Sequence, residues 1–260
     1  MTWFSGLSPV IQALIASIFT WLVTLLGALT VFFFKCINKK VLSIVLGFSA
    51  GVMLAASFWS LLIPAIDLSS KLNYIKWLIP SLGFIFGGLF VLLSDNFLDK
   101  VMVNSNVFCK KNLLLIIAIT MHNIPEGMAI GVAFGGVGLN SLGVSLIGAV
   151  MLALGIGIQN FPEGAAVSLP LRSSGMSRFK SFMIGQASAI VEPIFAVIGA
   201  LLVLFVQSLM PFLLSFAAGA MIIVVARELL PESVSGDKNL STFGLIIGFI
   251  IMMVLDVALG

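Results

Sequence analysis

Long apolar runs are the feature that most constrains how this chain can fold. Runs of more than about 18 apolar residues recur along the whole sequence, and each is long enough to cross a bilayer as a helix. Charged residues make up only 9% of the chain, whereas about a quarter of a soluble globular chain is charged. No stretch between the runs is long enough to fold separately. We therefore expect an all-α polytopic membrane protein in which residues 1–260 form a single transmembrane domain.

Eight candidate membrane spans account for these runs, and we expect them to form one bundle of eight transmembrane helices. The first run lacks the basic start and the small-residue cleavage site of a signal peptide and is too long for one, so we expect it to remain as a helix. The expected spans are Val10–Phe34, Val41–Ile63, Tyr74–Phe97, Leu113–Phe134, Leu142–Leu171, Phe179–Val206, Phe212–Leu230 and Phe243–Leu259.

Basic residues between the spans predict the orientation of the bundle, because cytoplasmic loops carry an excess of Lys and Arg. Ten basic residues follow spans one, three, five and seven, and only Lys71 and Lys76 lie on the opposite side. We therefore expect both termini outside the cytoplasm, in a multi-pass protein of the cell (inner or plasma) membrane. The net charge of +3 follows from this topology, so no nucleic-acid partner is expected. The ten residues are Lys35, Lys39, Lys40, Lys100, Lys110, Lys111, Arg172, Arg178, Lys180 and Lys238.

The two cysteines, Cys36 and Cys109, have neither metal-binding nor redox spacing. Both fall in segments that we expect on the cytoplasmic side. A disulfide between them is therefore not expected.

A six-residue phrase is repeated inside two of the apolar runs. It occurs as His122–Gly127 (HNIPEG) and again as Gln159–Gly164 (QNFPEG). Each copy places a carboxylate, two polar neighbours and a proline at the depth where a membrane helix is driest, and ionisable groups at that depth mark a pathway or a site. Two copies on separate helices predict one shared polar centre.

Helix geometry lets each phrase present its polar side chains together. At about 100° per residue, Glu126 projects between His122 and Asn123, one turn further along the helix, and the second phrase repeats this spacing around Glu163. A carboxylate has two oxygens, so the phrases can build two adjacent cation sites that share their glutamates. The prolines also leave backbone carbonyls without helical donors, and in lipid such carbonyls need a partner, which a cation, its water or a neighbouring helix supplies.

Glu192 is a third intramembrane carboxylate and again has a proline, Pro193, beside it. Three buried glutamates repel one another unless cations or protons neutralise them, which favours a cation site. One imidazole with carboxylate and amide oxygens suits a borderline divalent metal such as Zn²⁺, whereas an all-oxygen cage suits Ca²⁺ or Mg²⁺ better. His122, the only histidine, can equally serve a proton relay.

Other polar residues allow two interpretations each. Glu228 and Glu232 either line an exit or mark the membrane interface beside Arg227. Asp256 either attracts cations at an entrance or caps the outer end of the last span, and Asp67 has the position of an ordinary helix-end residue.

Ser49 lies in Gly47–Gly51, which matches the G-x-S-x-G pattern of serine hydrolases. That motif needs a strand–turn–helix, and this stretch lies inside a continuous span, so helix packing is the better interpretation. A metalloprotease would need two histidines one turn apart, and His122 is the only histidine in the chain.

On these residues the chain resembles the Zrt/Irt-like (ZIP) family of metal transporters, most of all its prokaryotic GufA-like branch. The similarity rests on the two phrases, on Gln186–Pro193, on Arg227–Ser233 and on Asp256, and it covers essentially the whole chain. It implies a mid-membrane binuclear metal centre and an elevator-like or rocking alternating-access carrier that moves Zn²⁺ toward the cytoplasm, and it allows a homodimer. The ligands implied by matching position are His122, Asn123, Glu126, Gln159, Asn160, Glu163 and Glu192, with Met53 as a plausible addition.

Three positions depart from the family pattern. Many relatives have His where this chain has Gln159, and some have Asp where it has Asn160. The missing charge at Asn160 bears on whether a second metal ion binds. Relatives often have His at the position of Arg227, whose fixed positive charge cannot bind metal.

We therefore expect a carrier of divalent transition-metal ions and not an enzyme. Zn²⁺ is the expected transported substrate, and Cd²⁺, Fe²⁺, Mn²⁺ and Co²⁺ suit the same ligands to different degrees. The alternatives are an intramembrane hydrolase that pairs Ser49 with His122, and a proton-coupled carrier of another solute.

Overall fold

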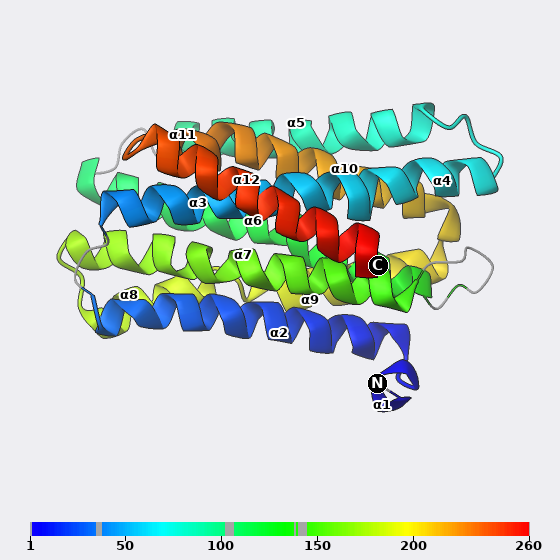
Figure 1. The fold of residues 1–260 in the computed structure, drawn as a ribbon, viewed down its shortest axis with the longest axis horizontal. Coiled ribbons are helices and arrows are strands. Elements are labelled where there is room, and N and C mark those ends of the chain that lie inside the picture. Colours follow the sequence, from blue (N-terminus) through cyan, green and yellow to red (C-terminus); the bar gives the residue numbers. More distant parts are fainter. Residues whose placement is uncertain (1, 35–37, 102–106, 138, 140–144, 260) are drawn as a thin grey trace.

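The computed structural model describes residues 2–34, 38–101, 107–137, 139 and 145–259, and within these ranges the side chains of residues 2, 95–101, 107–115, 117–119, 121, 122 and 259 lie outside the description. Every regular element in the described ranges is a helix (Figure 1), which confirms the all-α prediction. The expectation for Cys36 and Cys109 falls on residues outside the described side chains.

The helices follow one another along the chain with short connections. In order they are α1 (Thr2–Ser5), α2 (Pro9–Leu29), η1 (Thr30–Phe32), α3 (Lys39–Ala56), η2 (Ser57–Leu62), α4 (Ile63–Lys71), α5 (Leu78–Val101), α6 (Val107–Val137), α7 (Leu146–Ser173), α8 (Arg178–Ala187), α9 (Val191–Phe205), η4 (Gln207–Leu209), α10 (Met210–Val224), η5 (Val225–Leu229), α11 (Leu230–Val234), α12 (Lys238–Val254) and η6 (Leu255–Leu259).

Six helical stretches among the described residues are long and apolar enough to cross a membrane. The helices α5 and α6 occupy the other two predicted spans. The count of eight crossings and the outward-facing termini stay predictions, although α1 and the C-terminal end of α12 lie toward the same end of the molecule, as an even number requires (Figure 1). The six stretches are Pro9–Phe32, Lys39–Lys71, Leu146–Ser173, Arg178–Phe205, Gln207–Val234 and Lys238–Ala258.

Two of the predicted spans contain a proline-related feature that the sequence did not indicate. The second span was expected to end at Ile63, but the helical path continues to Lys71 because the wide π-helical turns of η2 precede Pro64 and accommodate its ring. The sixth span, expected as Phe179–Val206, is interrupted at residues 188–190, between α8 and α9. Pro193 lies in the first turn of α9, where a missing N–H leaves no helical bond unmade.

Small residues divide the helices into two groups. The pairs α2–α7 and α6–α9 approach backbone to backbone, and so do α3–α12 and α5–α10. A Cβ on Gly131 of α6 would lie 2.1 Å from the carbonyl oxygen of Ala196 in α9, and one on Gly47 of α3 would lie 2.1 Å from that of Ser241 in α12. We call α2, α6, α7, α8 and α9 the first group, and α3, α4, α5, α10, α11 and α12 the second group.

The boundary between the groups is packed differently. Among the described glycines, the one whose added Cβ would meet the other group is Gly155 of α7, and it faces the flexible thioether of Met252 in α12 instead of backbone. Close backbone approach at small residues is what holds membrane helices together. Each group is therefore locked internally, and at the one described glycine of the boundary a side chain takes the place of such a backbone contact.

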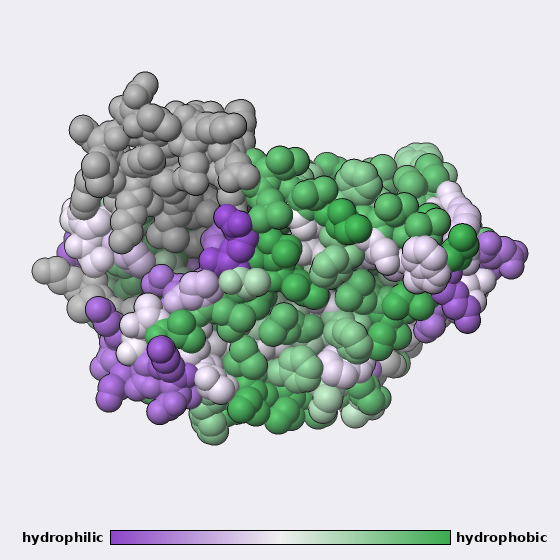
Figure 2. Space-filling view, turned by 90° about the horizontal axis from the view of Figure 1, so that it is seen from above, coloured by the Kyte–Doolittle hydropathy of each residue, from purple (hydrophilic) through white to green (hydrophobic). Residues whose placement is uncertain are grey.

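Hydrophobic side chains form a broad belt around the molecule. Figure 2 shows hydrophilic residues toward the two ends and hydrophobic residues between them. Large apolar side chains on α5 face outward, including Phe86 at 53% exposed and Leu93 at 64% exposed. Apolar surface of this extent is typical of a protein covered by lipid, and it supports a helical membrane protein.

Replacing Gly131 with Ala tests the backbone contact between α6 and α9. The new methyl group would press on the Ala196 carbonyl, and overpacking of this kind costs about 1–3 kcal/mol. We expect a lower melting temperature in detergent. The matched control is Gly148→Ala, whose Cβ would lie 3.8 Å from its nearest neighbour; the packing account fails if both variants melt alike.

Candidate metal centre

The two repeated phrases lie in α6 and α7, and both are buried at their polar positions. The side chains of Asn123, Glu126, Gln159 and Asn160 are at most 1% exposed, and that of Glu163 is 6% exposed. The side chain of His122 lies outside the described part of the structure, so its predicted ligand role stays a prediction.

A hydrogen bond joins the two phrases. The Nε2 of Gln159 donates to Oε1 of Glu126 at 2.6 Å. The remaining oxygen of each side chain, Oε1 of Gln159 and Oε2 of Glu126, is buried without a hydrogen-bond partner. Gln159 and Glu126 therefore link the two phrases, and each retains one oxygen without a hydrogen-bond partner.

Asn123 is fixed by the break between α8 and α9. Its Nδ2 donates to the carbonyl oxygen of Ser188 at 3.0 Å, and its Oδ1 is buried without a partner. The Ser188 carbonyl is accessible to Asn123 because the helix is interrupted at residues 188–190. The sequence indicated the proline in this stretch but not the carbonyl that the break presents.

Asn160 and Glu192 form the other half of the centre. The Nδ2 of Asn160 donates to both oxygens of Glu192, at 2.9 and 3.0 Å, and Oδ1 of Asn160 is buried without a partner. The hydroxyl of Thr20 in α2 also donates to Oε2 of Glu192. Thr20 was missed from the sequence, although its spacing from Ser17 and Thr24 marks a buried polar stripe along the first span.

Three carboxylates therefore lie at one depth of the first group. Glu163 is close enough to Glu126 and to Glu192 for their negative charges to repel one another. Among the described side chains, however, no three acidic, Cys or His residues lie close enough together to hold a metal by themselves. Any cation here would depend on the amide oxygens, and on His122, as much as on the acids.

The centre has an excess of acceptors. Among the described side chains, those of Asn123, Glu126, Gln159 and Asn160 each have a buried oxygen without a donor. A buried acceptor left without a partner costs about 1–3 kcal/mol, so these oxygens favour a hydrogen-bond donor or a cation beside them. A divalent cation can pair with several such oxygens at once, and carboxylate, amide and imidazole donors fit a borderline metal such as Zn²⁺.

The second group contributes little polar character to the centre. Ser49 of α3 donates to the backbone oxygen of Gln159 at 3.5 Å, the outer limit of a hydrogen bond. Met53 follows one turn later and packs in the apolar core, so its ligand role stays a prediction. The hydrolase alternative does not fit, because Ser49 lies inside the continuous helix α3 and not on a strand–turn–helix.

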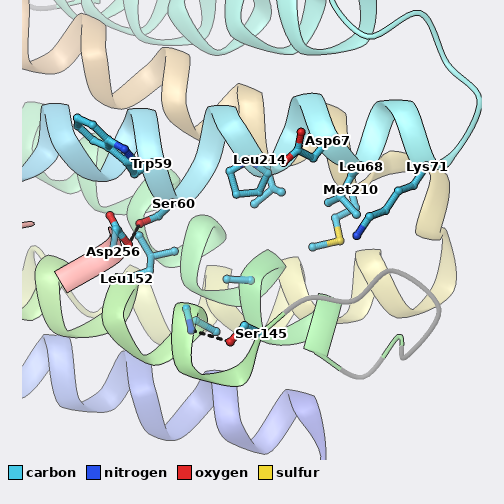
Figure 3. Close-up of a pocket in the computed structure, with 14 residues that line it drawn as sticks. Trp59, Ser60, Asp67, Leu68, Lys71, Ser145, Leu152, Met210, Leu214 and Asp256 are labelled. Atoms are coloured by element: carbon cyan, nitrogen blue, oxygen red, sulfur yellow. Dashed lines mark hydrogen bonds between the residues drawn. The ribbon is translucent and has the colours of Figure 1, made fainter. Parts of the chain in front are cut away.

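A second polar region lines a cavity of about 300 Å³ toward the end of the molecule where α4 ends (Figure 3). Asp256 and Asp67 line it together with Lys71, and Ser60 donates to Oδ1 of Asp256 at 2.6 Å. Asp67 is therefore more than the ordinary helix-end residue that the sequence suggested. Leu152 in the lining precedes Gln159 by seven residues of α7, which places the cavity about 10 Å along the helix from the centre.

The remaining candidates lie in η5 and α11. These two elements contact α3 of the second group. Arg227 and Glu232 are exposed, and Glu228 is partly buried. Both interpretations of the two glutamates, an exit or an interface marker, stay predictions.

The sequence matches a known family and several known proteins. Residues 102–256 match the family model described as ZIP Zinc transporter. Zinc transporter ZIP11 of Xenopus tropicalis is 36% identical over 98% of this chain and 99% of that protein. Zinc transporter GufA of Myxococcus xanthus is 34% identical over 95% of this chain and 98% of its own, and zinc transporter ZIPB of Bordetella bronchiseptica is 34% identical over 91% and 78%.

These matches confirm the family that the two phrases predicted. The family model covers more than half of the chain, and the relatives are named as transporters and not as enzymes. The chain is a helical membrane protein that belongs to the ZIP family of zinc transporters.

Proposed function

We propose that this protein carries divalent transition-metal ions, with Zn²⁺ as its main substrate, across the cell membrane toward the cytoplasm. The observation that carries the proposal is the set of buried oxygens without donors on α6 and α7. The names of the relatives support zinc as the substrate. Cd²⁺, Fe²⁺, Mn²⁺ and Co²⁺ accept the same types of ligand to different degrees.

The ion binds among the two phrases. Glu126 and Glu163 supply negative charge, the amide oxygens of Asn123 and Gln159 supply further ligands, and His122 supplies the nitrogen that favours Zn²⁺ over a hard cation. The adjacent position at Asn160 and Glu192 is where a second ion would bind in a binuclear centre. Met53 would add a thioether from the second group.

We further propose eight crossings with both termini outside the cytoplasm. The six spanning stretches, together with α5 and α6, give this number, and the predicted cytoplasmic loops carry most of the basic residues. The same orientation places the Asp256 cavity on the outer side. A homodimer, which the resemblance allows, is compatible with this layout.

The division into two helix groups supports an alternating-access mechanism. Every side chain of the proposed centre except Met53 belongs to the first group, which is locked internally by backbone contacts at glycines. At Gly155, the described glycine that faces the second group, the neighbour is the Met252 side chain and not backbone. We therefore propose that the first group carries the ion past the second group as a unit, as rigid-body transporters do around a fixed site.

The outer cavity serves as the entrance. Asp67 and Asp256 give it negative charge, which concentrates cations near the mouth. Along α7 the buried Ile156 falls between Leu152 of the cavity lining and Gln159 of the centre. Along α6 the buried Ile130 falls between Glu126 of the centre and Ala133 of the lining. This apolar layer separates the two sites, so movement of the groups is needed to connect them.

Removing either central carboxylate should abolish transport. In proteoliposomes loaded with a zinc-sensitive dye, we expect Glu126→Ala and Glu163→Ala to lower the uptake rate by at least about 100-fold, because a desolvated cation loses its counter-charge. Ser215→Ala, a buried polar change in the second group, is the control. Undiminished uptake in both glutamate variants would refute the assignment, and uptake that ignores chelators would point to another solute.

Charges at the entrance should change the KM and leave the maximal rate nearly unchanged. We expect Asp67→Asn and Asp256→Asn each to raise the KM for Zn²⁺ several-fold at low salt, since local attraction falls. Lys71→Gln in the same cavity should lower it. Both effects should shrink at high salt. Shifts of the same sign in all three variants would contradict the entrance.

Cross-linking the two groups should stop transport. After Cys36→Ser and Cys109→Ser, the pair Gly155→Cys and Met252→Cys places two thiols across the boundary, where a Cβ on Gly155 meets the Met252 side chain. Oxidation should block uptake, and reduction should restore it.

The matched control joins two helices of the second group. A Cβ on Gly88 of α5 would lie 3.1 Å from Cγ1 of Ile223 in α10, so Gly88→Cys with Ile223→Cys can also form a disulfide. Its oxidation should leave uptake unchanged. Equal uptake by the oxidised and reduced cross-boundary pair would contradict the movement.

A further inference from the structure

We propose that Glu192 is not a ligand of the transported ion but a positioning carboxylate. Held by Thr20, it fixes the amide of Asn160 and leaves the centre with room for a single ion. This inference rests on the proposed function, because it assigns roles within the same centre. It concerns the half of the centre in which the family pattern suggests a second metal.

Both carboxylate oxygens of Glu192 accept hydrogen bonds. Its Oε1 accepts from Asn160, and its Oε2 accepts from both Asn160 and Thr20. The side chain is fully buried at 0% exposed, and neither oxygen is among those without a partner. A metal ion at Glu192 would have to compete with charge-assisted hydrogen bonds, which are the strong ones.

Glu126 differs in this respect. Among the described side chains, a single amide donor reaches its Oε1, and its Oε2 is buried with no partner. Two carboxylates that the sequence pattern treats alike are therefore in opposite states. The open oxygen is on Glu126, and the satisfied pair of oxygens is on Glu192.

The orientation of Asn160 follows from its neighbours. Its Nδ2 faces three acceptors, the two oxygens of Glu192 and the backbone oxygen of Thr20 at 3.4 Å. A backbone oxygen and an ionised carboxylate cannot donate to an amide oxygen, so with Glu192 ionised the NH₂ faces them and Oδ1 faces away, where it has no partner. Glu192 thus orients Asn160 as an outer carboxylate orients a metal ligand.

The residue at position 160 decides between one ion and two. An ionised aspartate there would have no hydrogen to donate, and two carboxylates in contact would need a cation or a shared proton between them. Asparagine replaces that cation with its own N–H groups. The resulting hydrogen-bond chain joins α2, α7 and α9 through Thr20, Asn160 and Glu192.

Zinc stoichiometry tests the assignment of one ion. The full chain carrying Asp67→Asn and Asp256→Asn, which removes the two carboxylates of the outer cavity, is purified in detergent and equilibrated with ⁶⁵Zn²⁺. We expect Glu126→Gln to lose one equivalent, Glu192→Gln to keep the parental number, and Asn160→Asp to gain one. The gained equivalent should disappear in Asn160→Asp with Glu192→Gln, which ties the gain to the pair of carboxylates.

Two results would overturn the inference. One is the loss of an equivalent in Glu192→Gln, and the other is no gain in Asn160→Asp. Undiminished binding in Glu126→Gln would instead refute the proposed metal centre itself, so the two failures are distinguishable.

The role of Thr20 is tested by affinity. Thr20→Val keeps the branched shape and removes the hydroxyl, and we expect the Kd for Zn²⁺ to rise about 10-fold, the lower range for loss of an outer-shell partner. Thr20→Ser keeps the hydroxyl and should stay within about twofold of the parent. In the Glu192→Gln background, Thr20→Val should add nothing further. Equal effects of Val and Ser, or a full effect without Glu192, would show that Thr20 does not act through this carboxylate.

Discussion

Acceptor oxygens buried in a water-free interior are the constraint on which this structure depends. Within a bilayer, polar groups must be satisfied by the protein or by what it binds. Here each central amide uses its N–H groups on a fixed acceptor, as Gln159 does on Glu126 and Asn123 does on Ser188. Their oxygens are left without donors. In our proposal, the bound cation satisfies these oxygens and completes the site.

The rest of the fold holds these oxygens in place and lets them move together. The carbonyl of Ser188 is presented by the break between α8 and α9. The backbone of Glu192 lies against Gly127, where a Cβ would be 2.4 Å from the Glu192 carbonyl oxygen. Larger residues here would separate α6 from α9 and pull the two halves of the centre apart. The softer boundary at Gly155 and Met252 is where relative movement costs least.

Much of this could be predicted from the sequence, because a membrane limits the choices of a chain so strongly. Apolar runs indicated the helices, and the two phrases indicated which of them carry the centre. What the sequence could not indicate depends on contacts between distant spans. The role of Thr20 depends on the packing of α2 beside α9, which brings its hydroxyl to Glu192. The role of Asp67 depends on Asp256, which lines the same cavity. The continuation past Pro64 was missed because π-helical turns have no simple pattern.

The central claim is that oxygens carried by the first helix group bind the transported ion. Anomalous scattering at the zinc absorption edge, from crystals grown with Zn²⁺, tests it most directly. We predict a strong anomalous peak between α6 and α7, within bonding distance of Glu126 Oε2 and of the amide oxygen of Gln159. A zinc-loaded crystal with peaks only at the outer cavity or the surface, and with Glu126 and Glu163 turned away from each other, would contradict the account.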